Sequence, residues 1–328
     1  MAKIAYCTPG MGPSGGVRVI LEHCTRLKER GHDVVIINPS GNSPTLWEWY
    51  GPHNVPVVRN VQLQDNDFDV CVATGASTVY WARKVKAERY FYFVQMMEHL
   101  FARTATQEYH RCEQSYNLAR QQGMQVITIA KWLQQELTTK FGIAAEIIPN
   151  GVNQDHFYPD GKKQNYILVE GDDRNQAKDV QGVSWGAAEI LRQKYGVALY
   201  GYAALEHKYV NVMDEFFLRP DVEQMRKLYS GALFLLKASR FEGRSCAPVE
   251  AMCCGTTTVR GIINGDDDLV HEKNCLRTEY DLGKVIEQGE RLLRDDGLRA
   301  RLEKGCKKYA KRHLKWDKII DKLEETYG

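Results

Sequence analysis

The sequence predicts an α/β protein made of two doubly wound, Rossmann-like domains that face each other across a cleft. Short apolar segments of strand length alternate with segments whose apolar residues recur at helical spacing, which is typical of parallel sheets covered by helices. The alternation starts again after a polar, turn-rich joint at 158–165. A length of 328 residues also suits two domains, because single cores seldom grow beyond about 250–300 residues.

The first half begins with a strand, a glycine-rich loop and a helix. Residues 3–7 are predicted to form the strand, 9–16 the loop, and 17–30 a helix that ends at Gly31. Later strands of this half are predicted at 33–38, 69–73, 90–94, 125–129 and 145–148.

The loop contains the spacing G-x-G-x-x-G at Gly10, Gly12 and Gly15. Glycines let a backbone approach a phosphate, and the helix that follows offers N–H groups and a partial positive charge. An NAD-binding loop also needs an acidic residue at the end of the next strand, where this chain has Asn38-Pro39-Ser40. The motif is therefore weak evidence for a dehydrogenase, and a purely structural turn explains it better.

In the second half, strands are predicted at 166–170, 198–201, 232–236 and 256–259. Helices are predicted at 182–194, 221–229, 248–254 and 282–293, and a charged helix at 317–327 closes the chain. The expected domains are 1–157 and 158–316, with a C-terminal helix at 317–328 that packs back on the first domain.

The composition argues against several classes of protein. Lys and Arg number 44 and Asp and Glu 42, so a net charge of +2 gives no nucleic-acid signature. Residues 81–140 carry a local surplus of four positive charges, nine Lys/Arg minus five Asp/Glu. The nine cysteines contain no C-x-x-C pair, which argues against a zinc site. A membrane-span pattern and a signal peptide are both absent from the sequence, so we expect a cytoplasmic protein.

The most informative stretch is SRFEGRSCAPVEAMCCG, which begins at Ser239. Pro248 suits the first position of a helix, which would place Glu250 in the first turn. The loop at 243–247 would then lie at a helix N-terminus, whose N–H groups can receive a pyrophosphate. Glu242 could accept hydrogen bonds from a sugar and Glu250 from a ribose, although Glu250 could also be only a favourable first-turn charge.

Four motifs, taken in order, resemble the retaining glycosyltransferases of family 4. The family's E-x7-E signature stands here as Glu242-Gly-Arg-Ser-Cys-Ala-Pro-Val-Glu250. The segment Ile148-Pro-Asn-Gly-Val-Asn153 is similar to the family's I-P-N-G-V-D element, Gly15-Gly16 to its glycine loop, and Trp316 to its frequent C-terminal tryptophan. The resemblance covers nearly the whole chain and implies the two-domain GT-B fold.

The resemblance also implies an activity, the retaining transfer of a sugar from a nucleotide sugar to an acceptor hydroxyl. The donor would be a UDP-, GDP- or dTDP-sugar, with no obligatory metal or other cofactor. The acceptor would be a glycan or a lipid-linked saccharide, with peripheral membrane contact as a further expectation. Glu242 would be the catalytic residue. Donor binding would involve Gly15, Gly16, Arg174, Lys178, Gly243, Arg244, Ser245 and Glu250, and the acceptor side Gln95, Glu98 and His99.

One departure from the family pattern concerns the donor diphosphate. The family commonly has an arginine directly after the glycine that is here Gly171, but this chain has Asp172. Either Arg174 or Arg244 would have to replace that arginine.

A second departure concerns the acceptor. Gln95 stands where a histidine often ends the strand, so Glu98 or His99 could contact the acceptor instead. The alternative for His99 is an ordinary packed or surface histidine.

Three other functions remain compatible with the sequence. The first is a glycosyltransferase acting on modified pyrimidines in DNA, suggested by the surplus of positive charge at 81–140. The others are a GT-B sugar-nucleotide epimerase and a non-catalytic sugar-nucleotide-binding module, the latter suggested by Asp172. The sequence leaves open the donor base, the donor sugar, the acceptor and the oligomeric state.

Overall fold

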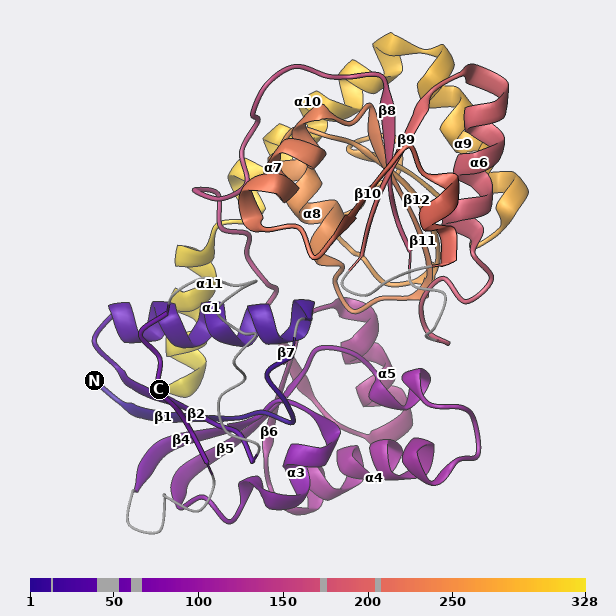
Figure 1. Cartoon of the computed structure of the whole chain (residues 1–328). Coiled ribbons are helices and arrows are strands. Elements are labelled where there is room, and N and C mark those ends of the chain that lie inside the picture. Colours follow the sequence, from indigo (N-terminus) through magenta and orange to yellow (C-terminus); the bar gives the residue numbers. More distant parts are fainter. Residues whose placement is uncertain (13, 40–52, 60–66, 172–175, 204–207) are drawn as a thin grey trace. The chain divides into compact units, whose positions relative to one another are not determined.

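The computed structural model describes residues 1–12, 14–39, 53–59, 67–171, 176–203 and 208–328 (Figure 1). The chain divides into two compact units. The first consists of Met1–Asn150 with Asp317–Gly328, and the second of Gly151–Trp316. The division lies at Asn150, earlier in the chain than the expected boundary at residue 157, and the last residues belong to the first unit.

The described part of the first unit contains a seven-stranded sheet with the order β3-β2-β1-β4-β5-β6-β7, and its pairs are parallel. The strands are β1 (Lys3–Cys7), β2 (Asp33–Ile37), β3 (Val57–Val58), β4 (Phe68–Ala73), β5 (Ala87–Val94), β6 (Gln125–Thr128) and β7 (Ala145–Ile147). The helices are α1 (Gly15–Glu29), α3 (Ala76–Ala82), the 3₁₀ turn η2 (Glu98–Phe101), α4 (Gln107–Gln121), α5 (Lys131–Phe141) and α11 (Trp316–Tyr327).

Aromatic residues of β5 contact helices on both faces of this sheet. Phe91 contacts Tyr327 of α11, with ring centroids 4.9 Å apart, and Phe93 contacts His23 of α1 at 5.1 Å. Tyr92 lies between them in sequence and packs on Tyr116 of α4, with centroids 5.9 Å apart. Because side chains alternate along a strand, α1 and α11 cover one face and α4 the other.

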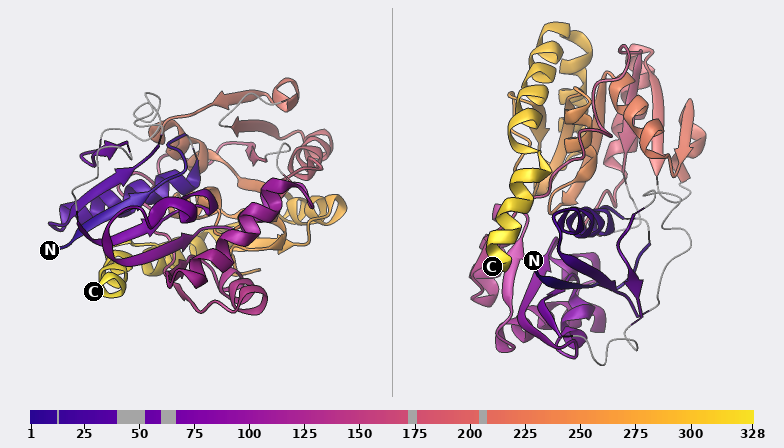
Figure 2. Two further views of the ribbon diagram at one scale, coloured as in Figure 1. Left: turned by 90° about the horizontal axis from the view of Figure 1, so that it is seen from below. Right: turned by 90° about the vertical axis from the view of Figure 1, so that its left-hand side faces the viewer.

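Helix α11 returns to the first unit because its apolar side is buried there. The Tyr327 hydroxyl lies 2.7 Å from that of Tyr6 on β1. Arg30, after α1, contacts Asp321 at 2.7 Å and Glu324 at 2.5 Å. The two ends of the chain consequently lie near each other on this unit (Figure 2).

The second unit repeats the architecture. Over its described residues the sheet has six parallel strands in the order β10-β9-β8-β11-β12-β13. The strands are β8 (Tyr166–Glu170), β9 (Ala198–Ala203), β10 (Glu215–Leu218), β11 (Phe234–Phe241), β12 (Thr258–Asn264) and β13 (Cys275–Thr278). The helices are α6 (Val183–Tyr195), the 3₁₀ turn η3 (Lys208–Val212), α7 (Val222–Gly231), α8 (Cys246–Cys253), α9 (Leu282–Arg294) and α10 (Asp296–His313).

Two hydrophobic clusters cover the two faces of the second sheet. Leu168 and Leu235 pack with residues of α7, α8 and α10. Their strand neighbours Ile167 and Leu236 pack with residues of α6 and α9. The structure therefore confirms the predicted pair of doubly wound α/β domains.

Several element bounds differ from the expectation, among them two helix starts and the end of one strand. Helix α1 begins at Gly15, not at residue 17, because the Ser14 side chain caps it by accepting from the Val17 N–H at 3.1 Å. Helix α8 begins at Cys246, so Glu250 lies beyond the first turn. Proline is tolerated throughout a first turn, where N–H groups have no intrahelical partner, and so Pro248 did not mark the start. Strand β11 continues to Phe241, well past the predicted end at 236.

Candidate active site

The carboxyl edge of the second sheet carries the densest group of predicted site residues. Strands β8 and β11 are neighbours in the sheet, but the helices that follow them lie on opposite faces, which makes this pair the topological switch point. Glu170 ends β8, and Glu242 directly follows β11. Ligands of doubly wound folds bind outside the strand ends at such a point.

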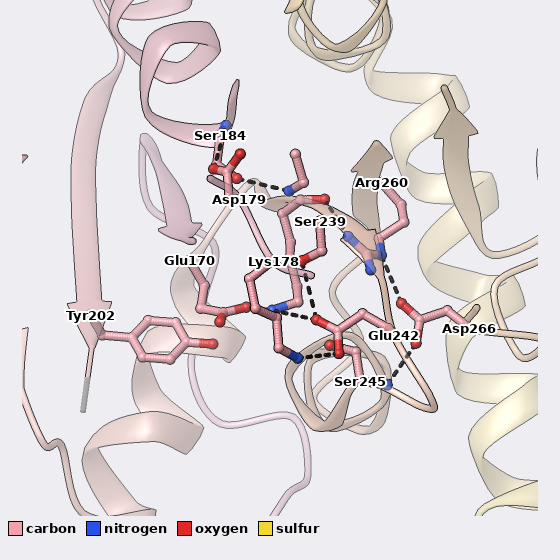
Figure 3. A network of polar contacts seen from close by, with 12 residues as sticks. Glu170, Lys178, Asp179, Ser184, Tyr202, Ser239, Glu242, Ser245, Arg260 and Asp266 are labelled. Atoms are coloured by element: carbon pink, nitrogen blue, oxygen red, sulfur yellow. Dashed lines mark hydrogen bonds and ion pairs between the residues drawn. The ribbon is translucent and has the colours of Figure 1, made fainter. Parts of the chain in front are cut away.

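Lys178 and Glu242 are brought into contact at this edge. The Phe241 N–H donates to the carbonyl of Ala177 at 2.8 Å, and the Arg240 N–H to that of Lys178 at 3.2 Å. These backbone bonds align the two segments, and Lys178 Nζ lies 2.5 Å from Glu242 Oε2 (Figure 3). Two candidates that are 64 positions apart thus form one ion pair.

Asp179 fixes the loop that carries Lys178. Its fully buried carboxylate accepts the backbone N–H groups of Val183 at 2.8 Å and Ser184 at 2.9 Å, at the start of α6. The Tyr280 hydroxyl adds a third bond at 2.9 Å. Burial raises the pKa of Asp179, although these hydrogen bonds oppose the shift.

Glu242 is a buried carboxylate surrounded by cations. Only 4% of it is exposed; Ser239 Oγ donates to its Oε1 at 3.1 Å, and Lys237 Nζ lies 3.6 Å from the same oxygen. Burial by itself would raise the pKa of Glu242, but the positive charges of Lys178, Lys237 and Arg260 outweigh it and lower the pKa to about 2. Glu242 is therefore ionised throughout the neutral pH range.

A row of charges crosses the sheet beneath Glu242. In the strand register, Lys237 is opposite Glu170 on β8 and opposite Arg260 on β12. Register partners point to the same face, and Lys237 forms an ion pair with Glu170. Sequence reasoning missed Lys237 and Arg260 as site residues. The available signal was a charged residue directly after each of two predicted apolar strands, 232–236 and 256–259.

Arg260 and Asp266 connect this row to the start of α8. Arg260 Nε donates to Asp266 Oδ2 at 2.7 Å, and the Ser245 N–H donates to Asp266 Oδ1 at 2.6 Å (Figure 3). Ser245 is the N-cap residue of α8. A buried ion pair thus holds the helix N-terminus that follows Glu242.

The other donor candidates of this region have different environments. The Arg244 guanidinium is bidentate on Asp268, with Nη2 2.8 Å from Oδ1, and it is buried together with Gly243. Glu250 is 6% exposed and accepts from the Tyr229 hydroxyl at 3.1 Å. Arg174 lies outside the described residues.

In the first unit, predicted donor and acceptor candidates meet at the carboxyl edge of β5. Gln95 Nε2 donates to the carbonyl of Gly16, in the first turn of α1, at 3.2 Å. A side chain at Gly16 would come within 3.3 Å of that amide. Glu98 lies beyond Gln95, and its Oε1 accepts the Ala76 N–H at 2.8 Å. Gly15 precedes Gly16 and is exposed.

No protein-family model and no curated protein matches the sequence. Solved structures do match. HepE from Anabaena, in complex with UDP-glucose, aligns with a TM-score of 0.82 at 14% identity over 99% of both chains. Sucrose-phosphate synthase from Thermosynechococcus elongatus aligns at 0.76 and 14% identity, over 100% of this chain and 98% of that one. TarM from S. aureus, in complex with fondaparinux, α-GlcNAc-glycerol and UDP, aligns at 0.63 and 15% identity, over 78% of this chain and 55% of that one.

The chain has the GT-B fold. Its two domains carry the parallel sheets described above, and each sheet has the doubly wound strand order. The expected GT-B fold is confirmed, and the alignments with HepE and sucrose-phosphate synthase cover 99% and 100% of the chain.

His99 of this GT-B chain is a packed histidine. It is 2% exposed, and its ring lies edge-on against Tyr109, Tyr116 and Phe141 at centroid distances of 5.2, 6.0 and 6.5 Å. Burial lowers the pKa of His99. Of the two readings open from the sequence, the structure favours packing over acceptor contact.

Glu98, the residue before His99, is partly exposed as a whole residue. Burial raises the pKa of Glu98 to about 7, although the bonds from Ala76 and Tyr92 favour the charged form. Between pH 4.5 and about 7, the folded chain therefore keeps the proton on Glu98. The same carboxyl in the unfolded chain, whose pKa has its ordinary value of 4.5, has lost it. It follows that Glu98 makes the fold less stable as the pH rises from 4.5 to 7.

We expect Glu98→Gln to remove this dependence. Between about pH 5 and about pH 8, the free energy of unfolding of the wild type should fall relative to the variant by on the order of 1–3 kcal/mol. Denaturant unfolding of both proteins at the two pH values measures the difference. An identical pH dependence in the two proteins would show that Glu98 titrates normally.

Among the described residues, no group of three or more His, Cys, Asp or Glu side chains is placed to hold a metal ion. The helices in the described ranges include none with the length and apolar character required to cross a bilayer.

Proposed function

We propose that the chain is a retaining glycosyltransferase that moves a sugar from a UDP-sugar to a hydroxyl of a glycan or lipid-linked saccharide. The observation that carries the proposal is the pairing of Lys178 with Glu242 at the switch point of the second sheet. An ammonium group can neutralise a diphosphate, and a carboxylate can hold sugar hydroxyls. UDP is the first nucleotide to test, because the Anabaena neighbour was solved with UDP-glucose.

The leaving group needs positive charge. When the bond between the anomeric carbon and the diphosphate breaks, negative charge develops on a phosphate oxygen. The Lys178 side chain is 27% exposed and can turn from Glu242 to that oxygen. The N-terminus of α8, after Ser245, adds the partial charge of a helix dipole. Positive charges placed where negative charge develops stabilise the transition state more than the ground state.

Retention requires attack on the face from which the diphosphate leaves. The acceptor oxygen forms its bond to the anomeric carbon, and the hydroxyl proton passes to the departing diphosphate oxygen. The products are the glycoside and the nucleoside diphosphate, and no further reactant is needed. Glu242 stays ionised during this step and orients the donor sugar through its hydroxyls.

We place the acceptor-binding site of this proposal in the first unit. Gln95 and Glu98 present an amide and a carboxyl at the carboxyl edge of its sheet, near the first turn of α1. Amides and carboxyls are suitable partners for sugar hydroxyls. A saccharide acceptor also agrees with the S. aureus neighbour, which was solved with fondaparinux and α-GlcNAc-glycerol.

A cytoplasmic location fits the nine cysteines, all of which are free.

A calorimetric screen against UDP-, GDP-, dTDP-, ADP- and CMP-sugars tests the proposal. We expect one nucleotide to bind clearly better than the others, and transfer assays with that donor to yield a product of retained anomeric configuration. Lack of binding by any of them would contradict the donor site. Interconversion of the sugar without an acceptor would indicate an epimerase.

The salt dependence of the reaction separates a saccharide acceptor from DNA. Raising salt from about 50 to about 200 mM should change KM for the acceptor by less than roughly threefold, whereas many phosphate contacts would cost about 10³–10⁵-fold. The net charge of +2 leads to this expectation. Initial rates over a series of salt concentrations measure it, and duplex DNA binding at about 200 mM salt would favour the DNA acceptor.

A further inference from the structure

Glu242 has two lysine neighbours that differ in freedom of movement. Lys178 Nζ faces Oε2 at 2.5 Å, and Lys237 Nζ faces Oε1 at 3.6 Å. The Lys178 side chain is 27% exposed and comes from a loop. Lys237 is 4% exposed and lies within β11. Lys178 can therefore leave the carboxylate, whereas Lys237 is held in place.

The row of charges formed by Glu170, Lys237 and Arg260 explains why the Lys237 side chain keeps its place beside Glu242. Its ammonium also pairs with Glu170, and its carbonyl accepts from Arg260 Nη1 at 3.1 Å. A lysine buried in a strand is costly unless its charge is matched, and Lys237 has carboxylates on two sides. Burial lowers the pKa of Lys237, although Glu242 opposes the shift.

We propose that Lys237 is a positioning residue that keeps the Glu242 carboxylate charged and oriented when Lys178 turns to the donor diphosphate. This rests on the proposed function, because it assigns Lys178 to the donor. Without Lys237, the donor would bring negative charge close to a buried carboxylate from which the Lys178 ammonium has just moved away. Among the described residues, Arg260 also favours ionisation of Glu242. The carboxylates of Glu170 and Asp266 pair with the same cations, Glu170 with Lys237 and Asp266 with Arg260.

Proton uptake on donor binding tests the proposal. The double variant Glu170→Gln/Lys237→Met removes both partners of one ion pair, so neither partner of that pair is left with an unmatched charge. UDP-glucose serves as the probe because its diphosphate diester has no group that titrates near neutral pH. Calorimetry in two buffers of different ionisation enthalpy then gives the number of protons taken up.

At about pH 5.5, we expect no uptake by the wild type and uptake on the order of 0.3 proton or more per site by the double variant. Adding Glu242→Gln should abolish the uptake, which assigns the proton to Glu242. Lys237→Arg keeps the charge and should behave as the wild type. The acid limb of the pH profile of kcat should also move upward in the double variant and return in Lys237→Arg.

Two results would overturn the inference: a folded double variant that binds UDP-glucose without proton uptake, or uptake that persists after Glu242→Gln. A wild-type protein that binds none of the screened nucleotide sugars would instead refute the proposed function, and the inference with it. That outcome is distinct because it is seen before any variant is made.

Discussion

Glu242→Gln should lower the rate of sugar transfer by about 10²-fold or more while leaving the protein folded and able to bind the nucleotide. The amide is of nearly the same size and can still accept from Ser239 and Lys178, but it carries no charge. Lys178 is then freer to meet the diphosphate, so nucleotide affinity should be retained. Steady-state kinetics and calorimetry with the preferred donor measure the two effects.

The matched control is Glu290→Gln. Glu290 forms an ion pair of the same length, 2.5 Å, with Lys194 on the outer surface of the second unit. The pair joins α6 to α9, its lysine is 53% exposed, and Glu290 keeps a second partner in Arg294 at 3.2 Å. Pairs of this kind contribute little to stability, and this one does not involve the strand ends that carry Glu242, so turnover should be unchanged. Near-normal turnover of Glu242→Gln would remove this carboxylate from the active site.

Lys178→Ala should weaken nucleoside-diphosphate binding by about 1.5–3 kcal/mol, or roughly 10- to 150-fold, and lower the turnover as well. The alanine removes the flexible cation of the site, while the fixed cation Lys237 remains on Glu242. The expected loss is that of one charge-assisted contact to a phosphate oxygen. Calorimetric titration of UDP into the wild type and the variant measures it.

Lys194→Ala is the control for this substitution, since it removes the lysine of the comparable surface pair. It should leave nucleotide affinity as it is in the wild type. If Lys178→Ala also binds UDP with unchanged affinity, then the loop between Gly171 and Lys178 does not serve the diphosphate, and Lys178 has only a structural role beside Glu242.

The sequence by itself determined the architecture and the main candidates. Apolar periodicity marked most strands of both sheets to within a few residues, since a strand buried on both faces cannot tolerate many polar side chains. The E-x7-E motif drew attention to Glu242, and the family pattern to Lys178. Signals of this kind can be read from the sequence because they depend only on residues within the same segment.

Only the tertiary structure decided which charges act together. Lys237 ended the predicted strand because a charge normally marks the edge of a core, yet β11 continues to Phe241 with that charge paired. Its partners Glu170 and Arg260 become neighbours through strand register, which no local pattern encodes. The burial of His99 by aromatic rings from two helices is likewise a non-local result. Charge pairing and burial depend on contacts between segments that are far apart in the chain. Only the folded structure therefore shows which of these residues share one site.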